Sequence, residues 1–350
     1  MYQITVAAAV AAVLLAASSS PARAAPAKAP PTPGAVTTFA VDCRSGARVT
    51  AAERAAVEAR ALENYNHIMS GRAAEAYALM SPSLRDEIGL SNYQETVDWA
   101  KGTDKMSGPR VTAVWMLDVE GTPPEQTTVC DDADGVPTAY VEISRVPAQA
   151  HVLIEATEAD GNVWTFSTWL HRERDTWWVY AFDPANSATG RTDAAGLWAL
   201  ARAQRAAGAE ENARLLYRFA YTLSHRGRTV TLPIRADILR EGEEAFPGEL
   251  EAESSPVHWT DGRVTYGAHH NVAAGDKDGL YIMLYRTASV WKGERAVDAE
   301  NREMLKSYMR SNPRWADAFA GVFVHAGHPD GETWFTTSYV TGEGWSKPAK

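Results

Sequence analysis

The segment from Ala139 to Phe182, AYVEISRVPAQAHVLIEATEADGNVWTFSTWLHRERDTWWVYAF, decides the predicted fold of the N-terminal half of the chain. It contains four stretches in which apolar residues alternate with others, at 139–146, 151–158, 163–172 and 177–182. Alternation of this kind, rich in aromatic and β-branched residues, is typical of strands with one buried face. The connections ADGN and RERDT are short, so neighbouring strands are predicted to pair as antiparallel hairpins. The result is a sheet whose apolar face must be covered by another element.

A helix that precedes the sheet is the predicted cover. Thr50 followed by Glu53 has the pattern of a capping box, which marks the start of a helix. Apolar residues then recur at helical spacing, at Leu62, Tyr65, Ile68 and Met69. The facing residues of the sheet are predicted to be Trp164, Phe166, Thr168 and Leu170 on the third strand, and Trp178, Tyr180 and Phe182 on the fourth. We expect the two apolar faces to pack against each other.

Two segments resemble a known family. IMSGRAAEAYALMSPSLRDEI (68–88) resembles that family's helix, glycine and A-Y-x-L-x-S-P segment, and WTFSTWLHRERDTWWVYAF (164–182) resembles its terminal hairpin. Residues 50–185 thus resemble the nuclear-transport-factor-two-like cone fold, which includes SnoaL-like and ketosteroid-isomerase-like domains. The resemblance implies a sheet curled around the first helix, with a conical cavity between them. Because this family contains both enzymes and non-catalytic binders, the resemblance implies a fold rather than a function.

The whole chain is predicted to be an α+β protein with five parts. These are a signal peptide (1–24), a Pro/Ala-rich linker (25–47), a cone-like domain (48–190), a helical hairpin (191–228) and a smaller α+β domain (229–350). The hairpin has the packing residues of one tetratricopeptide unit, but a solenoid needs about three units, so a plain helical hairpin is preferred. The remainder of the chain resembles uncharacterised exported bacterial proteins.

The start of the chain predicts export. Ile4 to Ala17 is a short apolar run, and the cleavage pattern Ala22-Arg23-Ala24 follows it. A membrane anchor is the alternative, but a spanning helix needs about 20 apolar residues. We therefore expect a periplasmic or secreted protein with no membrane span after signal cleavage.

The two cysteines and the charge agree with that location. Cys43 and Cys130 are the only cysteines, and in an oxidising compartment we expect a disulfide between them rather than two free thiols. A net charge of -10 argues against binding to nucleic acid or to anionic membrane surfaces.

Motifs for metal, cofactor or nucleophile chemistry are missing from the sequence. The loops DDADG (131–135) and GDKDG (275–279) lack the ligands that an EF-hand needs at loop positions one and twelve. Five histidines lie in the C-terminal part, but two of them, His269 and His270, are adjacent on a predicted strand and point to opposite faces. We therefore expect neither a metal site nor a cofactor.

The predicted cone cavity supplies the candidate site. Its ligand-binding candidates are Tyr65, Tyr140, Trp164 and Trp169, although aromatic residues on a sheet face are more often part of a core. Glu142 and His151 are weak catalytic candidates, because burial in an apolar cavity would shift the pKa of either group toward that of a general base.

Three functions follow from these observations. The first is an exported, non-catalytic binding or accessory protein of the bacterial envelope, whose partner is a small apolar molecule or an envelope protein. The second is a small-molecule enzyme of the ketosteroid-isomerase-like class, with a buried carboxylate or histidine as general base. The third is a structural partner in an envelope assembly, which would expose an apolar patch of several hundred Å². The oligomeric state is left open by the sequence.

Overall fold

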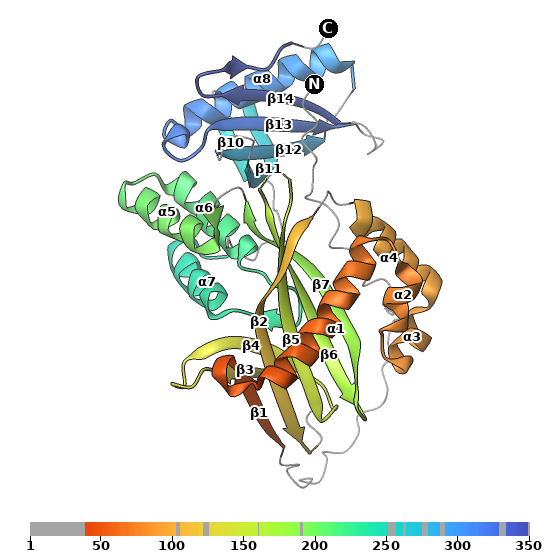
Figure 1. Cartoon of the computed structure of the whole chain (residues 1–350). Coiled ribbons are helices and arrows are strands. Elements are labelled where there is room, and N and C mark those ends of the chain that lie inside the picture. Colours follow the sequence, from red (N-terminus) through yellow and green to blue (C-terminus); the bar gives the residue numbers. More distant parts are fainter. Residues whose placement is uncertain are drawn as a thin grey trace, which may run out of the picture.

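The structure is a computed structural model of the whole chain, and it describes residues 39–102, 106–121, 126–159, 161–189, 192–248, 250, 257–261, 264–274, 279–287, 291–328 and 334–348. The predicted signal peptide and residues 25–38 of the predicted linker lie outside this part of the chain. Helices occur with an antiparallel sheet in the first half and with a largely antiparallel sheet in the second, which confirms the α+β class (Figure 1). No helix in the described ranges is both long and apolar enough to span a membrane.

Four helices open the N-terminal half after the short 3-10 helix η1 (Gly46–Arg48). They are α1 (Ala51–Met69), α2 (Ala73–Ala78), α3 (Pro82–Ile88) and α4 (Leu90–Gly102). The predicted capping box starts α1: the Glu53 backbone N–H donates to Thr50 Oγ1 at 3.2 Å, and the Thr50 N–H donates to Glu53 Oε2 at 2.9 Å. This reciprocal pair satisfies two backbone donors that the first helical turn would otherwise leave unpaired.

A curved, six-stranded antiparallel sheet wraps around α1 (Figure 1). Its strands, in spatial order, are β1 (Ala40–Ser45), β2 (Ser107–Glu120), β5 (Ala148–Thr157), β6 (Val163–Glu173), β7 (Thr176–Thr189) and β8 (Thr192–Asp193). Tyr65 of α1 meets Phe166 of β6 edge to face at 4.9 Å between ring centroids. The predicted packing of the third strand on the first long helix is therefore confirmed.

Two buried layers lie on opposite faces of this sheet. The helix-facing layer contains Val57, Ala61, Tyr65, Ile68, Val152, Phe166 and Leu170, among others. The back layer contains Cys43, Trp115, Leu117, Cys130, Val141, Ile143, Leu153 and Val230. Because side chains alternate along each strand, neighbouring residues of β5 and β6 belong to different layers.

The prediction that residues 139–146 pair with residues 151–158 is wrong. The first of these segments forms β4 (Pro137–Ile143), which joins β3 (Gln126–Asp131) and β9 (Val230–Thr231) in a separate three-stranded sheet. The place beside β5 is taken by β2, and β4 instead packs face to face on the large sheet through the back layer. Alternation indicates a buried face, but it does not distinguish pairing at a strand edge from packing on the face of a sheet.

Two smaller expectations also fail. Residues 40–45 of the predicted linker form β1, which pairs with β2 and buries Cys43 and Ser45. Tyr180 does not share a face with Phe182, because a bulge places Tyr180 between the partners of Trp169 and Leu170. Its ring instead meets Trp169 at 4.9 Å, on the face away from α1.

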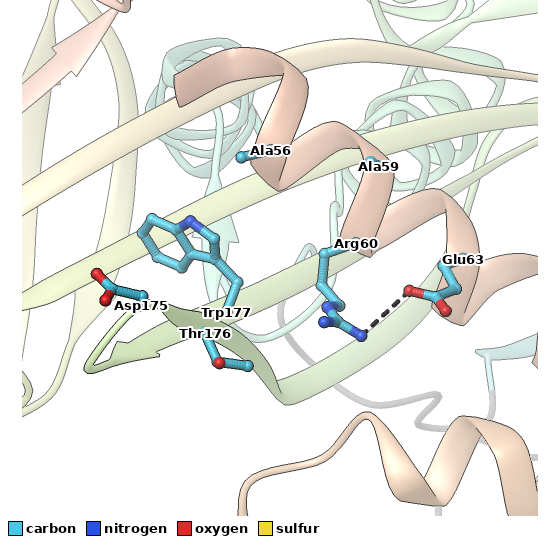
Figure 2. Close-up of a pocket in the computed structure, with 7 residues that line it drawn as sticks. All are labelled: Ala56, Ala59, Arg60, Glu63, Asp175, Thr176 and Trp177. Carbon is cyan, nitrogen blue, oxygen red and sulfur yellow. Dashed lines mark hydrogen bonds and ion pairs between the residues drawn. The ribbon is translucent and has the colours of Figure 1, made fainter. Parts of the chain in front are cut away.

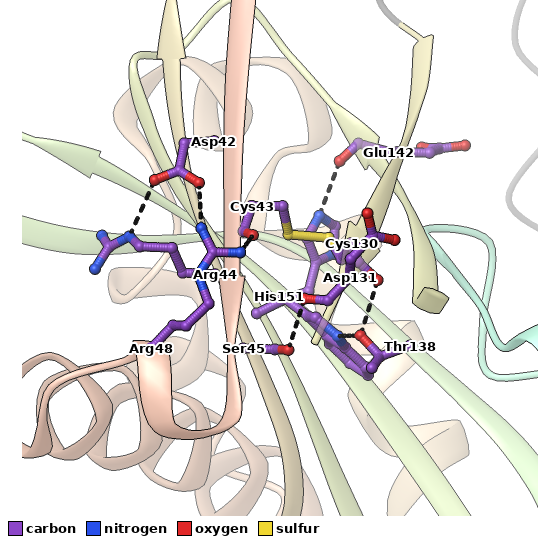
Figure 3. Close-up of a disulfide and its surroundings, with 11 residues drawn as sticks. Asp42, Cys43, Arg44, Ser45, Arg48, Cys130, Asp131, Thr138, Glu142 and His151 are labelled. Atoms are coloured by element: carbon purple, nitrogen blue, oxygen red, sulfur yellow. Dashed lines mark hydrogen bonds and ion pairs between the residues drawn. A yellow bond between two sulfur atoms is a disulfide. The ribbon is translucent and has the colours of Figure 1, made fainter. Parts of the chain in front are cut away.

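The predicted disulfide joins Cys43 to Cys130 and links the large sheet to the small one (Figure 3). Ser45 Oγ also donates to the Asp131 carbonyl at 3.4 Å. The edge of the large sheet at β1 is therefore tied covalently to β3.

The second half of the chain shares one hydrophobic core. The helices are α5 (Ala194–Ala206), α6 (Glu210–Leu223), α7 (Pro233–Ala245) and α8 (Glu294–Ser311), with the 3-10 helix η2 (Trp315–Asp317). The sheet contains, in order, β10 (Val257–Asp261), β11 (Val264–Ala274), β12 (Leu280–Thr287), β13 (Gly321–Gly327), β14 (Trp334–Val340) and β15 (Gly344–Trp345). Leu216 of α6 and Ile282 of β12 belong to the same buried cluster, so the helical hairpin packs on the C-terminal sheet.

Candidate functional site

Two of the predicted ligand-binding residues, Tyr65 and Trp164, lie in the helix-facing layer. Tyr65 is 3% exposed, and burial raises the pKa of its hydroxyl to about 12. Trp164 is also buried, and its indole N–H has no hydrogen-bond partner. Both rings fill space between α1 and the sheet, as core residues do.

His151 and Trp169 lie on the opposite face, beside the back layer. Their rings stack at 5.1 Å, and His151 Nε2 donates to the Glu142 carbonyl at 2.8 Å (Figure 3). Since a carbonyl only accepts, the proton of the neutral imidazole is on Nε2, and buried Nδ1 has no partner. Burial lowers the pKa of His151 to about 4, so the imidazole is neutral near pH 7.

Glu142 and Tyr140 belong to β4 of the small sheet. The Glu142 side chain is exposed, while its backbone is held by the Thr229 carbonyl and by His151. Tyr140 is half-buried, opposite Val129 and Thr231 in the strand register. The six residues predicted to share a cavity are therefore distributed over two faces of one sheet and a second sheet.

An asparagine that the sequence analysis missed lies within the helix-facing layer. Asn64 is fully buried, and neither its side-chain oxygen nor its nitrogen has a hydrogen-bond partner. Its position between Ala61 and Ile68 continues the buried stripe of α1. A buried amide without hydrogen-bond partners costs about 1 to 3 kcal/mol of stability. The sequence pattern that could have indicated Asn64 is a polar residue within an apolar helical stripe.

The accessible candidate site is a pocket between the outer face of α1 and the β6–β7 turn (Figure 2). It has a volume of about 230 Å³, and we name it the α1–hairpin groove. Its lining residues are Ala56, Ala59, Arg60, Glu63, Asp175, Thr176 and Trp177. The first four recur at spacings of three, one and three residues, so they form one stripe on α1. Figure 2 shows the Trp177 indole between the α1 alanines and Asp175.

The charged groups at this groove are paired with each other. Arg60 Nη1 lies 3.1 Å from Glu63 Oε2, and Arg172 Nη2 lies 3.3 Å from Asp175 Oδ1. The guanidinium of Arg172 is also 5.9 Å from the centroid of the Trp177 ring. The groove therefore combines the carbon atoms of two alanines and an indole with charged side chains that are each held in an ion pair, one of them with Arg172 outside the lining.

The turn that forms one wall of the groove is strained. Arg174 and Asp175 connect β6 to β7, and Arg174 has φ 56°, the one positive φ of a non-glycine residue in the described part of the chain. A two-residue hairpin with positive φ at its first position favours glycine, and an L side chain there costs about 1 kcal/mol. Such strain is found more often at functional sites than elsewhere.

In the sequence, RERDT has the pattern of a charged turn, and neither Arg60 nor Trp177 is among the predicted site residues. The signal that could have found the groove is the exposed stripe of small and charged residues on α1, which is too narrow to be distinguished from an ordinary solvated face.

Comparisons with protein-family models, curated proteins and solved structures find no match to this chain. The described residues contain no group of three or more His, Cys, Asp or Glu side chains arranged to hold a metal ion.

Proposed function

We propose that the protein is an exported, non-catalytic binding protein of the bacterial envelope that holds a small molecule in the α1–hairpin groove. The observation that carries the proposal is a half-buried indole, Trp177, which packs against the helix-facing layer and lines the groove between apolar helix positions and paired charges. Aromatic walls with a few oriented polar groups are typical of small-molecule sites. Export is supported by the predicted signal sequence and by the disulfide, which suits an oxidising compartment.

The rigidity of the two walls supports binding at this place. One wall is a capped helix of 19 residues, and the other is a hairpin within a six-stranded sheet. A site on such elements loses little conformational entropy when a ligand binds. A volume of about 230 Å³ is below the range of about 300 to 1,000 Å³ that is typical of pockets for drug-sized ligands, so the groove has space for one small unit only.

The general-base alternative has less support. Glu142 is exposed on the small sheet, and the imidazole of His151 is enclosed by Trp169 and by the backbone of β4. An enzyme of the ketosteroid-isomerase-like class needs the base beside a ligand cavity. The assembly alternative has little support either, because the exposed large apolar residues in the described ranges, Leu90, Val129, Val136 and Trp334, are spread over separate elements.

Native mass spectrometry of the mature protein, purified from its own periplasm, tests the proposal. We expect a retained small-molecule adduct on the wild type and on Ala55→Trp, and loss of that adduct in Ala59→Trp. Both alanines are exposed on α1, but only Ala59 lines the groove, so the two variants differ in whether the new indole fills it. An adduct that persists in Ala59→Trp would place the ligand elsewhere.

A further inference from the structure

The paired charges of the α1–hairpin groove give a charged ligand no unpaired group of opposite sign to bind. Arg60 is bound to Glu63, and Arg172 to Asp175, so neither sign of charge is left in excess. A free anion or cation would have to compete with an existing ion pair. A neutral ligand gains hydrogen bonds without breaking either pair, because each carboxylate has spare acceptors and each guanidinium has spare donors.

The polar groups on the rim suit a ligand with several adjacent hydroxyls. A guanidinium next to a carboxylate presents donors and acceptors side by side, which matches neighbouring hydroxyls that both donate and accept. Arg60 and Glu63 supply such a pair on α1, and Thr176 adds a hydroxyl on the opposite wall.

The floor of the groove suits a flat ligand with C–H groups on one face. The Trp177 indole has a negative π-face that attracts the positive edge of C–H bonds. Ala56 and Ala59 end at Cβ, so α1 leaves space beside the indole, whose ring centroid also lies 5.9 Å from the Arg172 guanidinium. Asp175 is 99% exposed at its side chain, so the groove opens to solvent at that end and admits a longer chain.

We infer that the α1–hairpin groove binds a neutral pyranose unit of an oligosaccharide. One C–H face of the sugar ring stacks on Trp177, and its hydroxyls bond to the Arg60–Glu63 pair and to Thr176. This inference rests on the proposed function and adds the chemical class of the ligand. Because the groove is open and small, we expect a dissociation constant of about 0.1 to 1 mM for a trisaccharide.

Saturation-transfer difference NMR on the mature protein tests the inference with three probes: cellotriose, chitotriose and, as a charged control, trigalacturonic acid. We expect transfer to the ring C–H protons of at least one neutral trisaccharide, and at least fivefold less to the charged one. Ala59→Trp and Trp177→Ala should reduce the signal at least tenfold, while Ala55→Trp, at a position outside the groove, should retain it. Ala59→Trp, which fills the groove and keeps the Trp177 indole, keeps the test valid if Trp177→Ala disturbs folding.

The results separate the two proposals. Absence of transfer to both neutral probes, or transfer that Ala59→Trp leaves unchanged, would overturn the saccharide inference. If the natively purified protein nevertheless carries a non-saccharide adduct that Ala59→Trp removes, then the binding function stands and only the ligand class is wrong. If the adduct is absent as well, both proposals fail.

Discussion

At the scale of single residues, Asn64 is a polar group placed where the surrounding layer is apolar. Both of its amide atoms are buried without partners, next to Ala61 and Tyr65 on the covered face of α1. Desolvation of an amide without compensating hydrogen bonds opposes folding. The residue therefore reduces stability in the state that the structure describes.

Replacing Asn64 by the similarly sized Leu should stabilise the protein. We expect the free energy of unfolding to rise by about 1 to 3 kcal/mol, because the unpaired amide is removed and apolar surface is buried in its place. Urea denaturation followed by circular dichroism measures the change. Asn66→Leu on the exposed face of α1 is the control and should change stability little. A loss of stability in Asn64→Leu would show that the amide has a partner in solution.

Gly227 is the residue whose backbone conformation and close packing both require glycine. Its φ is +91°, and a Cβ there would lie 2.4 Å from Ser167 Oγ and 2.7 Å from Asp183 Cβ. We expect Gly227→Ala to lower the free energy of unfolding by about 2 to 4 kcal/mol. Gly208→Ala separates the two causes, because Gly208 has φ +76° but open space around its Cβ position, so strain alone should cost about 1 kcal/mol. Equal losses in the two variants would contradict the steric explanation.

At the scale of elements, two buried histidines connect the large sheet to the segment around β4. His151 Nε2 donates to the Glu142 carbonyl, and His171 Nε2 lies 3.0 Å from Ser144 Oγ. Burial lowers the pKa of His151 to about 4; burial, and then the nearby His151, lower that of His171 to about 3. Both groups are therefore more easily protonated in the unfolded chain than in the folded one.

The free energy of unfolding should therefore decrease as the pH is lowered. Because the folded pKa values lie below the ordinary value of 6.5, the stabilisation is complete above about pH 6.5 and is lost as pH falls toward 4 and 3. The contribution of His151 alone is on the order of 3 kcal/mol. Urea denaturation from pH 4 to pH 8 should show this slope in the wild type and a shallower one in His171→Phe, which keeps the ring stack on Tyr180. If the free energy of unfolding changes with pH equally in the two proteins, His171 does not contribute to the pH dependence.

The disulfide is the covalent link between the same two sheets. It joins residues 87 positions apart, so the chain-entropy model gives a contribution of about 4 to 5 kcal/mol. The double variant Cys43→Ser, Cys130→Ser should therefore unfold at a lower urea concentration than the oxidised wild type. Reduction should shift the wild type to the same midpoint and leave the variant unchanged. Equal midpoints for oxidised wild type and variant would show that the bridge does not stabilise the fold.

The elements divide clearly into those that local sequence determines and those that it does not. Thr50 and Glu53 determine the start of α1, and the short turn at Arg174 determines the pairing of β6 with β7, because each needs only neighbouring residues. The position of β4 depends on contacts with β2 and β5, and its alternating pattern is the same in either arrangement. Bulges such as that at Tyr180 likewise leave no mark in the alternation.

At the scale of the whole molecule, the large sheet is covered on both faces and so divides the residues that the sequence assigned to one cavity. The aromatic candidates Tyr65 and Trp164 pack toward α1, while Trp169 packs toward the small sheet. The groove that remains accessible combines Arg60 with Trp177, which are distant in sequence and meet only when the hairpin returns to α1. No local pattern predicts such a site, since each half looks like ordinary surface.

The most direct test of the groove as the binding site is an NMR titration of the mature protein labelled with ¹⁵N at its tryptophan indoles. The titrant is the molecule released from natively purified protein, and the Trp177 resonance is identified by its absence in Trp177→Phe. We predict that the Trp177 cross-peak shifts most, while those of Trp164 and Trp169 stay in place. Shifts of the Trp164 or Trp169 cross-peak without a shift of the Trp177 cross-peak would contradict binding in the groove and would indicate a ligand site in the buried layers of the large sheet.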